Sequence, residues 1–244
     1  MGESDSSGDT MCEDDTGPAV SRRRMLSASP AVVAASVGAV AASQTEAGAA
    51  VRTVQRICRA AWGAQPPTGE FDAHQIERLT VHHSAVALRD NRKAPQHLRV
   101  YQEDHQSRGW PDIAYHLLVD RHGNVYQGRP MLAVGDSATP YDPTGHLLVL
   151  CIGNFEVQGV SAAQLDATIN VLAWASARFD VAASTIRGHR DYAATSCPGK
   201  DLYHFIADGT VERRVARRAG NVRMTDLCGR AGRRRVRQIE NGTD

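Results

Sequence analysis

The chain lacks a long apolar run and any internal repeat. No apolar stretch reaches the roughly 18–20 residues, free of polar interruptions, that a strong membrane span needs. What remains is an ordinary globular composition, with 42% hydrophobic and 23% charged residues, so a sizeable core can be buried. A length of 244 residues suits one domain with extensions, or two small domains.

The first 49 residues differ from the rest. Three arginines within residues 21–26 precede a mildly apolar stretch over residues 30–42, and Ala47-Gly48-Ala49 supplies a small-residue cleavage pattern. This order is typical of an export signal, and paired arginines with weak hydrophobicity resemble a twin-arginine signal. We predict a twin-arginine-type signal peptide over residues 1–49. The protein would then be secreted or associated with the cell wall, with no stable membrane anchor after cleavage. A disordered alanine-rich leader is the alternative.

Removal of this leader changes the charge. Residues 50–244 hold 25 basic and 20 acidic residues, a formal net charge of +5. This excess weakly favours an anionic surface such as a bacterial wall. Ten arginines lie between Val211 and Gln238. We interpret residues 211–244 as a solvated helix end followed by a loose basic tail, and contact with an anionic wall polymer is the alternative.

Residues 50–210 carry the patterns of regular structure. After an arm over residues 50–70, we expect strands over 77–85, 112–119, 125–127, 147–152 and 185–188, and helices over 91–108, 161–179 and 200–219. The turn at residues 120–124 predicts a hairpin, and the continuous apolar run LLVLCI at 147–152 predicts a central buried strand. Ser161 and Gln164 fit a capping box. The order of elements predicts an α/β fold: a single domain with a mixed central β-sheet flanked by helices.

Histidine and cysteine recur in three short segments: VHHSA at 81–85, GHRD at 188–191 and SCPG at 196–199. Zinc prefers nitrogen and sulfur ligands, and a fold can gather ligands that lie far apart in sequence. Two imidazoles and one thiolate leave a fourth tetrahedral position open, which is typical of catalytic zinc. Because neighbouring strand residues point to opposite faces, only one of His82 and His83 can face the metal. The pattern predicts a zinc hydrolase.

The remaining cysteines have other expected roles. Cys12 lies in the leader, and Cys151 lies inside the apolar run and is expected to be a buried thiol. An exported protein can oxidise a pair of cysteines. We expect Cys58–Cys228 to tie the N-terminal arm to the C-terminal segment, although sequence alone does not determine the connectivity.

With three further segments, the chain resembles a known family. RAAWGA at 59–64, AYHLLVDRHGNVYQGRP at 114–130 and IGNF at 152–155 complete a set similar to type 2 N-acetylmuramoyl-L-alanine amidases and the peptidoglycan recognition proteins that share their fold. The set covers roughly residues 55–205. The resemblance implies that Zn²⁺ is bound by His82 rather than His83, together with His189 and Cys197. It also implies catalytic roles for two hydroxyl groups, those of Tyr115 and Thr195.

The same resemblance implies a reaction: zinc-assisted hydrolysis of the amide between N-acetylmuramic acid and L-alanine in peptidoglycan. We expect peptidoglycan or muropeptides as partners, no nucleic acid, and a monomer. A non-catalytic peptidoglycan-binding module of the same fold, or an amidase acting on a different wall amide, is the alternative.

Two departures from the family pattern concern the chemistry. Some relatives place a glutamate in the central strand, whereas residues 147–152 contain no carboxylate. Tyr115 is then the best candidate for part of the proton transfer, and Glu156 is a weaker one. Many relatives also have a histidine in the loop at 134–138, where this chain has Asp136 and Ser137. Trp62 and Trp110 fit either wall contacts or the core.

Overall fold

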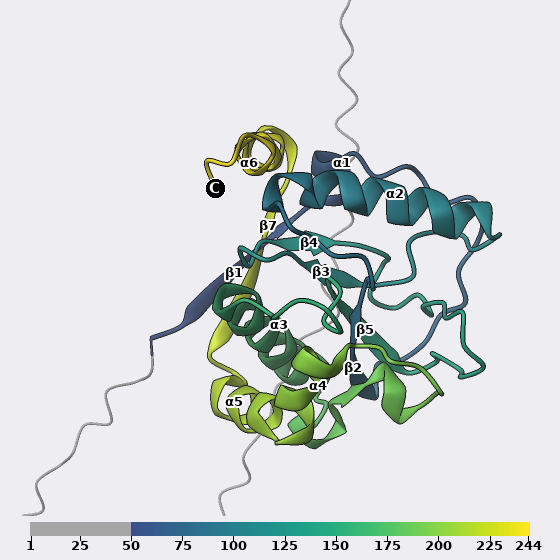
Figure 1. Ribbon diagram of the computed structural model, residues 1–244, viewed down its shortest axis with the longest axis vertical. Coiled ribbons are helices and arrows are strands. Elements are labelled where there is room, and N and C mark those ends of the chain that lie inside the picture. Colours follow the sequence, from purple (N-terminus) through teal and green to yellow (C-terminus); the bar gives the residue numbers. More distant parts are fainter. Residues whose placement is uncertain (1–49) are drawn as a thin grey trace, which may run out of the picture. The chain divides into compact units, whose positions relative to one another are not determined.

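A seven-stranded mixed β-sheet runs through residues 50–244, the part of the chain that the computed structural model describes (Figure 1). Its strands are β1 (Arg52–Ile57), β2 (Arg78–His83), β3 (Leu117–Val119), β4 (Val125–Gln127), β5 (His146–Cys151), β6 (Arg187–Gly188) and β7 (Val222–Leu227). They lie in the order β6-β2-β5-β3-β4-β1-β7. The β3–β4 pair is antiparallel and the other pairs are parallel. The predicted signal peptide over residues 1–49 lies outside the described residues.

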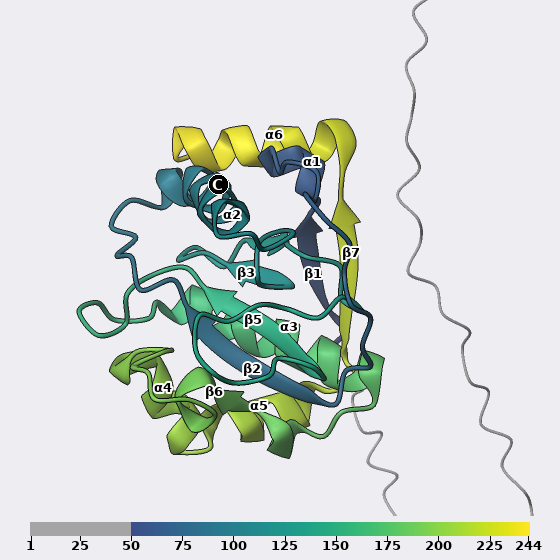
Figure 2. The same ribbon diagram turned by 90° about the vertical axis from the view of Figure 1, so that its right-hand side faces the viewer.

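Helices cover both faces of this sheet (Figures 1 and 2). They are α1 (Arg59–Trp62), α2 (Ala94–Ser107), α3 (Ala162–Phe179), α4 (Lys200–Ala207), α5 (Thr210–Arg218) and α6 (Gly229–Asn241), with 3₁₀ turns η1 (Asn91–Lys93), η2 (Ala183–Thr185) and η3 (His189–Asp191). Side chains of α3, α4 and α5 join one apolar core, and side chains of α1, α2 and α6 join the other. This arrangement confirms the predicted α/β fold class.

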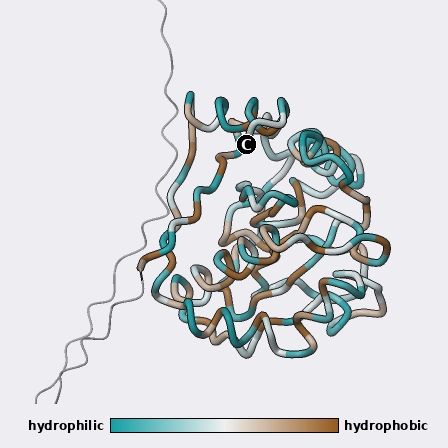
Figure 3. Tube along the Cα trace, turned by 60° about the vertical axis from the view of Figure 1, so that its left-hand side comes forward, coloured by the Kyte–Doolittle hydropathy of each residue, from teal (hydrophilic) through white to brown (hydrophobic). Residues whose placement is uncertain are grey.

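Hydrophobic residues concentrate in the interior segments of the trace (Figure 3), and their side chains form the two buried cores between the sheet and the helices. Strand β5 is buried along its whole length between β2 and β3, which confirms the predicted central strand. The predicted hairpin is also present, as β3 and β4. None of the helices within residues 50–244 is both long enough and apolar enough to span a bilayer.

Three predicted elements differ in extent. The strand expected from residue 112 begins only at Leu117, because the His116 imidazole accepts a hydrogen bond from the Leu148 amide (2.9 Å) in place of a backbone carbonyl. The helix expected over residues 200–219 is divided into α4 and α5 at Gly209, whose φ is +74°. Ser161 caps α3, where its hydroxyl accepts a hydrogen bond from the Gln164 amide (3.1 Å). The Gln164 side chain donates instead to the carbonyls of Val119 and Ile152, so the bond from the Ser161 amide to this side chain, which would complete the capping box, is absent.

The predicted loose basic tail is wrong for residues 211–244. Val211 and Val215 of α5 are buried, β7 pairs with β1 along its full length, and α6 packs on the sheet through Val236 and Ile239. The apolar residues are few, but their spacing places them on one face of each helix. These residues extend the domain.

Two cysteine predictions are confirmed. Cys58 and Cys228 form a disulfide that joins residues 170 positions apart, and it links the start of α1 to the start of α6. Cys151 is a fully buried free thiol at the end of β5.

Candidate metal centre

The three predicted ligands meet beside the edge of the sheet formed by β2 and β6. His82 lies near the carboxyl end of β2, and His189 follows β6 directly. Because Val81 pairs with Gly188 in parallel, the residues that follow them, His82 and His189, reach the same region. Cys197 lies in the loop between η3 and α4. All three side chains are buried, and their candidate ligand atoms lie within 4.8 Å of one another.

The distances within this trio fit a tetrahedral zinc ion. The Nδ1 atom of His82 lies 3.7 Å from the Sγ atom of Cys197. Zinc bonds of about 2.3 Å to sulfur and about 2.0 Å to nitrogen, at a tetrahedral angle, separate the two ligand atoms by about 3.5 Å. The ring centroids of His82 and His189 are 4.7 Å apart. The donor set and its spacing therefore fit zinc, with one coordination position left for water or substrate.

A hydroxyl group orients His189. The Thr139 hydroxyl lies 2.7 Å from His189 Nε2, and Ser137 lies at 3.5 Å from the same nitrogen. When Nε2 donates to Thr139, Nδ1 keeps its lone pair and can bind a metal. Histidine ligands are commonly held in this way by an oxygen on the second ring nitrogen. Thr139 lies in the loop before β5, and its importance was not predicted from the sequence.

Burial favours the neutral form of each member of the trio. It lowers the pKa of His82 well below the usual value, and the nearby His189 acts in the same direction. Burial also lowers the pKa of His189. Both imidazoles therefore keep a lone pair for a metal at neutral pH. Burial raises the pKa of the Cys197 thiol to about 12, so this residue becomes a thiolate only when a cation compensates its charge.

His83 takes a different place from His82. Its backbone amide donates to Cys197 Sγ (3.4 Å), which favours a negative charge on the sulfur. Its ring stacks on Phe155, and its Nδ1 accepts from the Phe155 amide (3.3 Å). The His83 side chain thus contributes to packing, and His82 is the member of the pair that lies with His189 and Cys197.

Tyr115 lies next to His82, just before β3. The two ring centroids are 5.3 Å apart. A side chain at Gly128 would overlap the Tyr115 carbonyl, so the glycine lets the returning strand hold this tyrosine in place. Burial and the adjacent Cys197 raise the pKa of Tyr115 above its usual value. The phenol therefore stays protonated at neutral pH and can donate a hydrogen bond.

The other predicted residues divide into two groups. Thr195 is near the trio, where its hydroxyl accepts from the Cys197 amide (3.2 Å). Ser137 faces His189, whereas Asp136 forms an ion pair with Arg129. Glu156 pairs with Arg190 (3.2 Å) and accepts from the Lys200 amide (2.8 Å), so its carboxylate is already engaged.

A second tyrosine, which the sequence pattern did not predict, lies beside the trio. The Tyr141 ring lies 4.9 Å from that of His189 and stacks on Tyr192. Its hydroxyl is buried and has no hydrogen-bond partner within residues 50–244. In the sequence, only its composition distinguishes the loop at 130–146 from other connecting segments. A lone aromatic residue among prolines, glycines and aspartates was the available signal.

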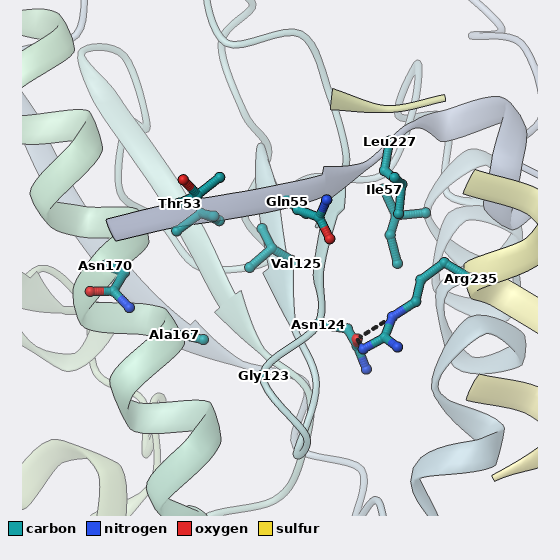
Figure 4. Close-up of a pocket in the computed structure, with 11 residues that line it drawn as sticks. Thr53, Gln55, Ile57, Gly123, Asn124, Val125, Ala167, Asn170, Leu227 and Arg235 are labelled. Atoms are coloured by element: carbon teal, nitrogen blue, oxygen red, sulfur yellow. Dashed lines mark hydrogen bonds between the residues drawn. The ribbon is translucent and has the colours of Figure 1, made fainter. Parts of the chain in front are cut away.

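The two tryptophans do not form a common surface. Trp62 is fully buried in the core, and half-buried Trp110 packs against His105. A cavity of about 220 Å³ lies elsewhere, between β1, β4, α3 and α6 (Figure 4). Its one charged side chain, Arg235, donates to Asn124 (2.7 Å), and none of its lining residues belongs to the trio.

Comparison with known proteins identifies the family. Residues 72–200, just over half of the chain, match the family model described as N-acetylmuramoyl-L-alanine amidase. The chain belongs to the N-acetylmuramoyl-L-alanine amidase family. Its match to this amidase family includes His82, His189 and Cys197, and it confirms the resemblance seen in the sequence motifs.

The relatives of this chain include proteins named as peptidoglycan-recognition proteins and as amidases. Peptidoglycan-recognition protein SD of Drosophila simulans is 36% identical over 155 residues, which are 62% of this chain and 83% of the relative. N-acetylmuramoyl-L-alanine amidase of Sus scrofa is 30% identical over 213 residues, 82% of this chain and 34% of the relative. The solved structure of peptidoglycan recognition protein-LE in complex with tracheal cytotoxin, a monomeric diaminopimelic acid-type peptidoglycan, is 30% identical. Its TM-score is 0.57, and the match covers 63% of this chain and 92% of that chain.

Proposed function

We propose that this protein is a zinc-dependent amidase that cleaves the bond between N-acetylmuramic acid and L-alanine in peptidoglycan. The observation that carries the proposal is the convergence of two imidazoles and a thiol within 4.8 Å. A domain that only binds peptidoglycan does not need a buried cysteine beside two buried histidines. The name of the Sus scrofa relative and the peptidoglycan fragment bound by recognition protein-LE support the substrate class. Export remains a prediction from residues 1–49.

The residues around the trio have separate roles in this proposal. When bound, zinc supplies Lewis-acid polarisation of a carbonyl and a water that loses a proton near neutral pH. Thr139 holds His189 in the tautomer with a free Nδ1, and the His83 amide stabilises the sulfur of Cys197. These contacts keep the donor set ready for the metal.

Two phenols can stabilise charge on the substrate. As an amide is attacked, negative charge develops on its oxygen, and a fixed hydrogen-bond donor lowers the energy of that state. Tyr115 stays protonated beside His82, and we assign it this role. Tyr141, whose hydroxyl lacks a partner within the described residues, lies on the His189 side and provides a second donor. The Thr195 hydroxyl is a neutral donor on the Cys197 loop.

The chain offers a matched pair of cysteines for a test. Cys197→Ala should lower the zinc content from about one ion per chain toward none, and should abolish release of L-alanine N-termini from peptidoglycan. Cys151→Ala, which removes the second buried free thiol within residues 50–244, should keep zinc and activity. Normal activity in Cys197→Ala, or zinc-loaded wild-type protein that cleaves no peptidoglycan, would contradict the proposal.

A further inference from the structure

Helix α6 presents a row of arginines to solvent. Four exposed arginines recur at i, i+3, i+4 and i+7, a spacing that places them on one face of a helix. We call them the arginine stripe: Arg230, Arg233, Arg234 and Arg237. The opposite face of α6 is buried against the domain through Gly232, Val236 and Ile239.

Acidic side chains nearby are engaged elsewhere. Asp226 pairs with Arg56 (2.7 Å), Glu240 pairs with Arg99 (3.0 Å), and the Asp244 carboxylate accepts from Asn124 (2.8 Å). Within residues 50–244, no side chain of the arginine stripe has a hydrogen bond or an ion pair. Among the described residues, the stripe is therefore a set of four positive charges without an acidic partner.

This arrangement is unfavourable for the isolated helix. Arginines three and four positions apart repel one another on a helix surface. Arg230, in the first turn, also opposes the positive end of the helix dipole. A soluble helix needs neither feature, since alternating charges would keep it equally soluble. An anionic partner would remove the repulsion, and no acidic side chain within residues 50–244 pairs with the stripe to prevent this.

The helix is held rigidly on the domain. The Cys58–Cys228 disulfide fixes its start, and β7, which leads into it, pairs with β1 over six residues. Both features lie outside residues 72–200, the part that matches the family model. Because the apolar face of α6 is already buried, the helix has no free face to insert into a bilayer. The stripe also contains no aromatic side chain on which a nucleic-acid base could stack.

We propose that the arginine stripe binds a linear wall polymer whose charges are phosphodiesters, and so holds the protein at its substrate. The choice of a wall polymer rests on the proposed function. The stripe extends about 10 Å along α6, with adjacent side chains about 5–6 Å apart, which suits successive phosphates of one extended chain. Figures 1 and 2 show α6 at the opposite end of the domain from β2, the strand that carries His82. A polymer on α6 therefore leaves the metal centre open.

The test uses poly(glycerol phosphate) as the probe. Replacing all four stripe arginines by glutamine should weaken binding at least about tenfold at low salt, and should reduce the slope of log K against log salt by about three. A matched control replaces four exposed arginines scattered elsewhere: Arg52, Arg89, Arg108 and Arg217. This control carries the same net charge and should bind within about threefold of wild type.

Several results would overturn the proposal. These are no binding by wild type at low salt, equal loss in the stripe and control variants, or tighter binding of wild type to duplex DNA or anionic vesicles than to the polymer. Cleavage of a short soluble muropeptide separates the two proposals. The stripe variant should keep that activity and a wild-type melting temperature. Polymer binding without cleavage would instead count against the amidase function.

Discussion

The contact between Thr139 and His189 gives a quantitative test of the metal centre. Thr139→Val keeps the shape of the side chain but removes the hydroxyl that lies 2.7 Å from Nε2. Loss of such an orienting partner typically lowers metal affinity about 10–100-fold, or about 1.4–2.8 kcal/mol. Ser137, at 3.5 Å from the same nitrogen, is at the limit of a hydrogen bond and compensates only in part. We therefore expect zinc affinity to fall by at least about tenfold.

Equilibrium competition with a chelator of known zinc affinity measures this change. Thr139→Ser restores a hydroxyl and should bind zinc nearly as wild type does. Thr144→Val makes the same substitution at an exposed position of the same loop and should have no effect. If Thr139→Val binds zinc as tightly as wild type, the Thr139 hydroxyl does not prepare His189 for the metal. That result would refute the assigned role of the Thr139–His189 contact.

Three other predictions concern turnover, stability and pH. Tyr115→Phe should keep its zinc but lower turnover about 100-fold, because it removes a donor to the developing oxyanion. Tyr101→Phe is the control, and wild-type turnover in Tyr115→Phe would mean that Tyr115 only packs. Replacing Cys58 and Cys228 by serine frees a loop of 170 residues and should lower the free energy of unfolding in urea by about 2–5 kcal/mol; an unchanged midpoint would contradict this. Burial lowers the pKa of His116 to about 3, so below about pH 6.5 the unfolded chain binds a proton that the folded chain does not. The contribution of His116 to the free energy of unfolding is fully present above pH 6.5. It falls by about 1.4 kcal/mol for each pH unit between pH 6.5 and pH 3. Urea titrations at pH 7 and pH 5 check the sign, and equal free energies would refute it.

The central part of the fold could be predicted because its patterns are local. The apolar run around Leu147–Cys151 has one stable environment, a strand buried on both faces, and Ser161 starts α3 by a hydrogen bond to a residue three positions away. The metal trio could be predicted because its residue types have a distinctive chemistry. These features depend on side-chain identity more than on distant partners.

The C-terminal segment could not be predicted in the same way. Val236 and Ile239 are too few to mark a buried helix among arginines, and β7 becomes a strand because β1, about 170 residues earlier, offers it a free edge. Thr139 and Tyr141 were missed for a related reason. Their loop has no periodic pattern, and only the folded chain shows that it passes beside His189.

Mass spectrometry of peptidoglycan after digestion tests the central claim most directly. Zinc-loaded protein should release stem peptides with a free L-alanine amino terminus and leave glycan strands with intact muramic acid. The metal-free protein and Cys197→Ala should release neither. Digestion products cut at another bond, or intact peptidoglycan after incubation with protein shown to contain zinc, would contradict the account.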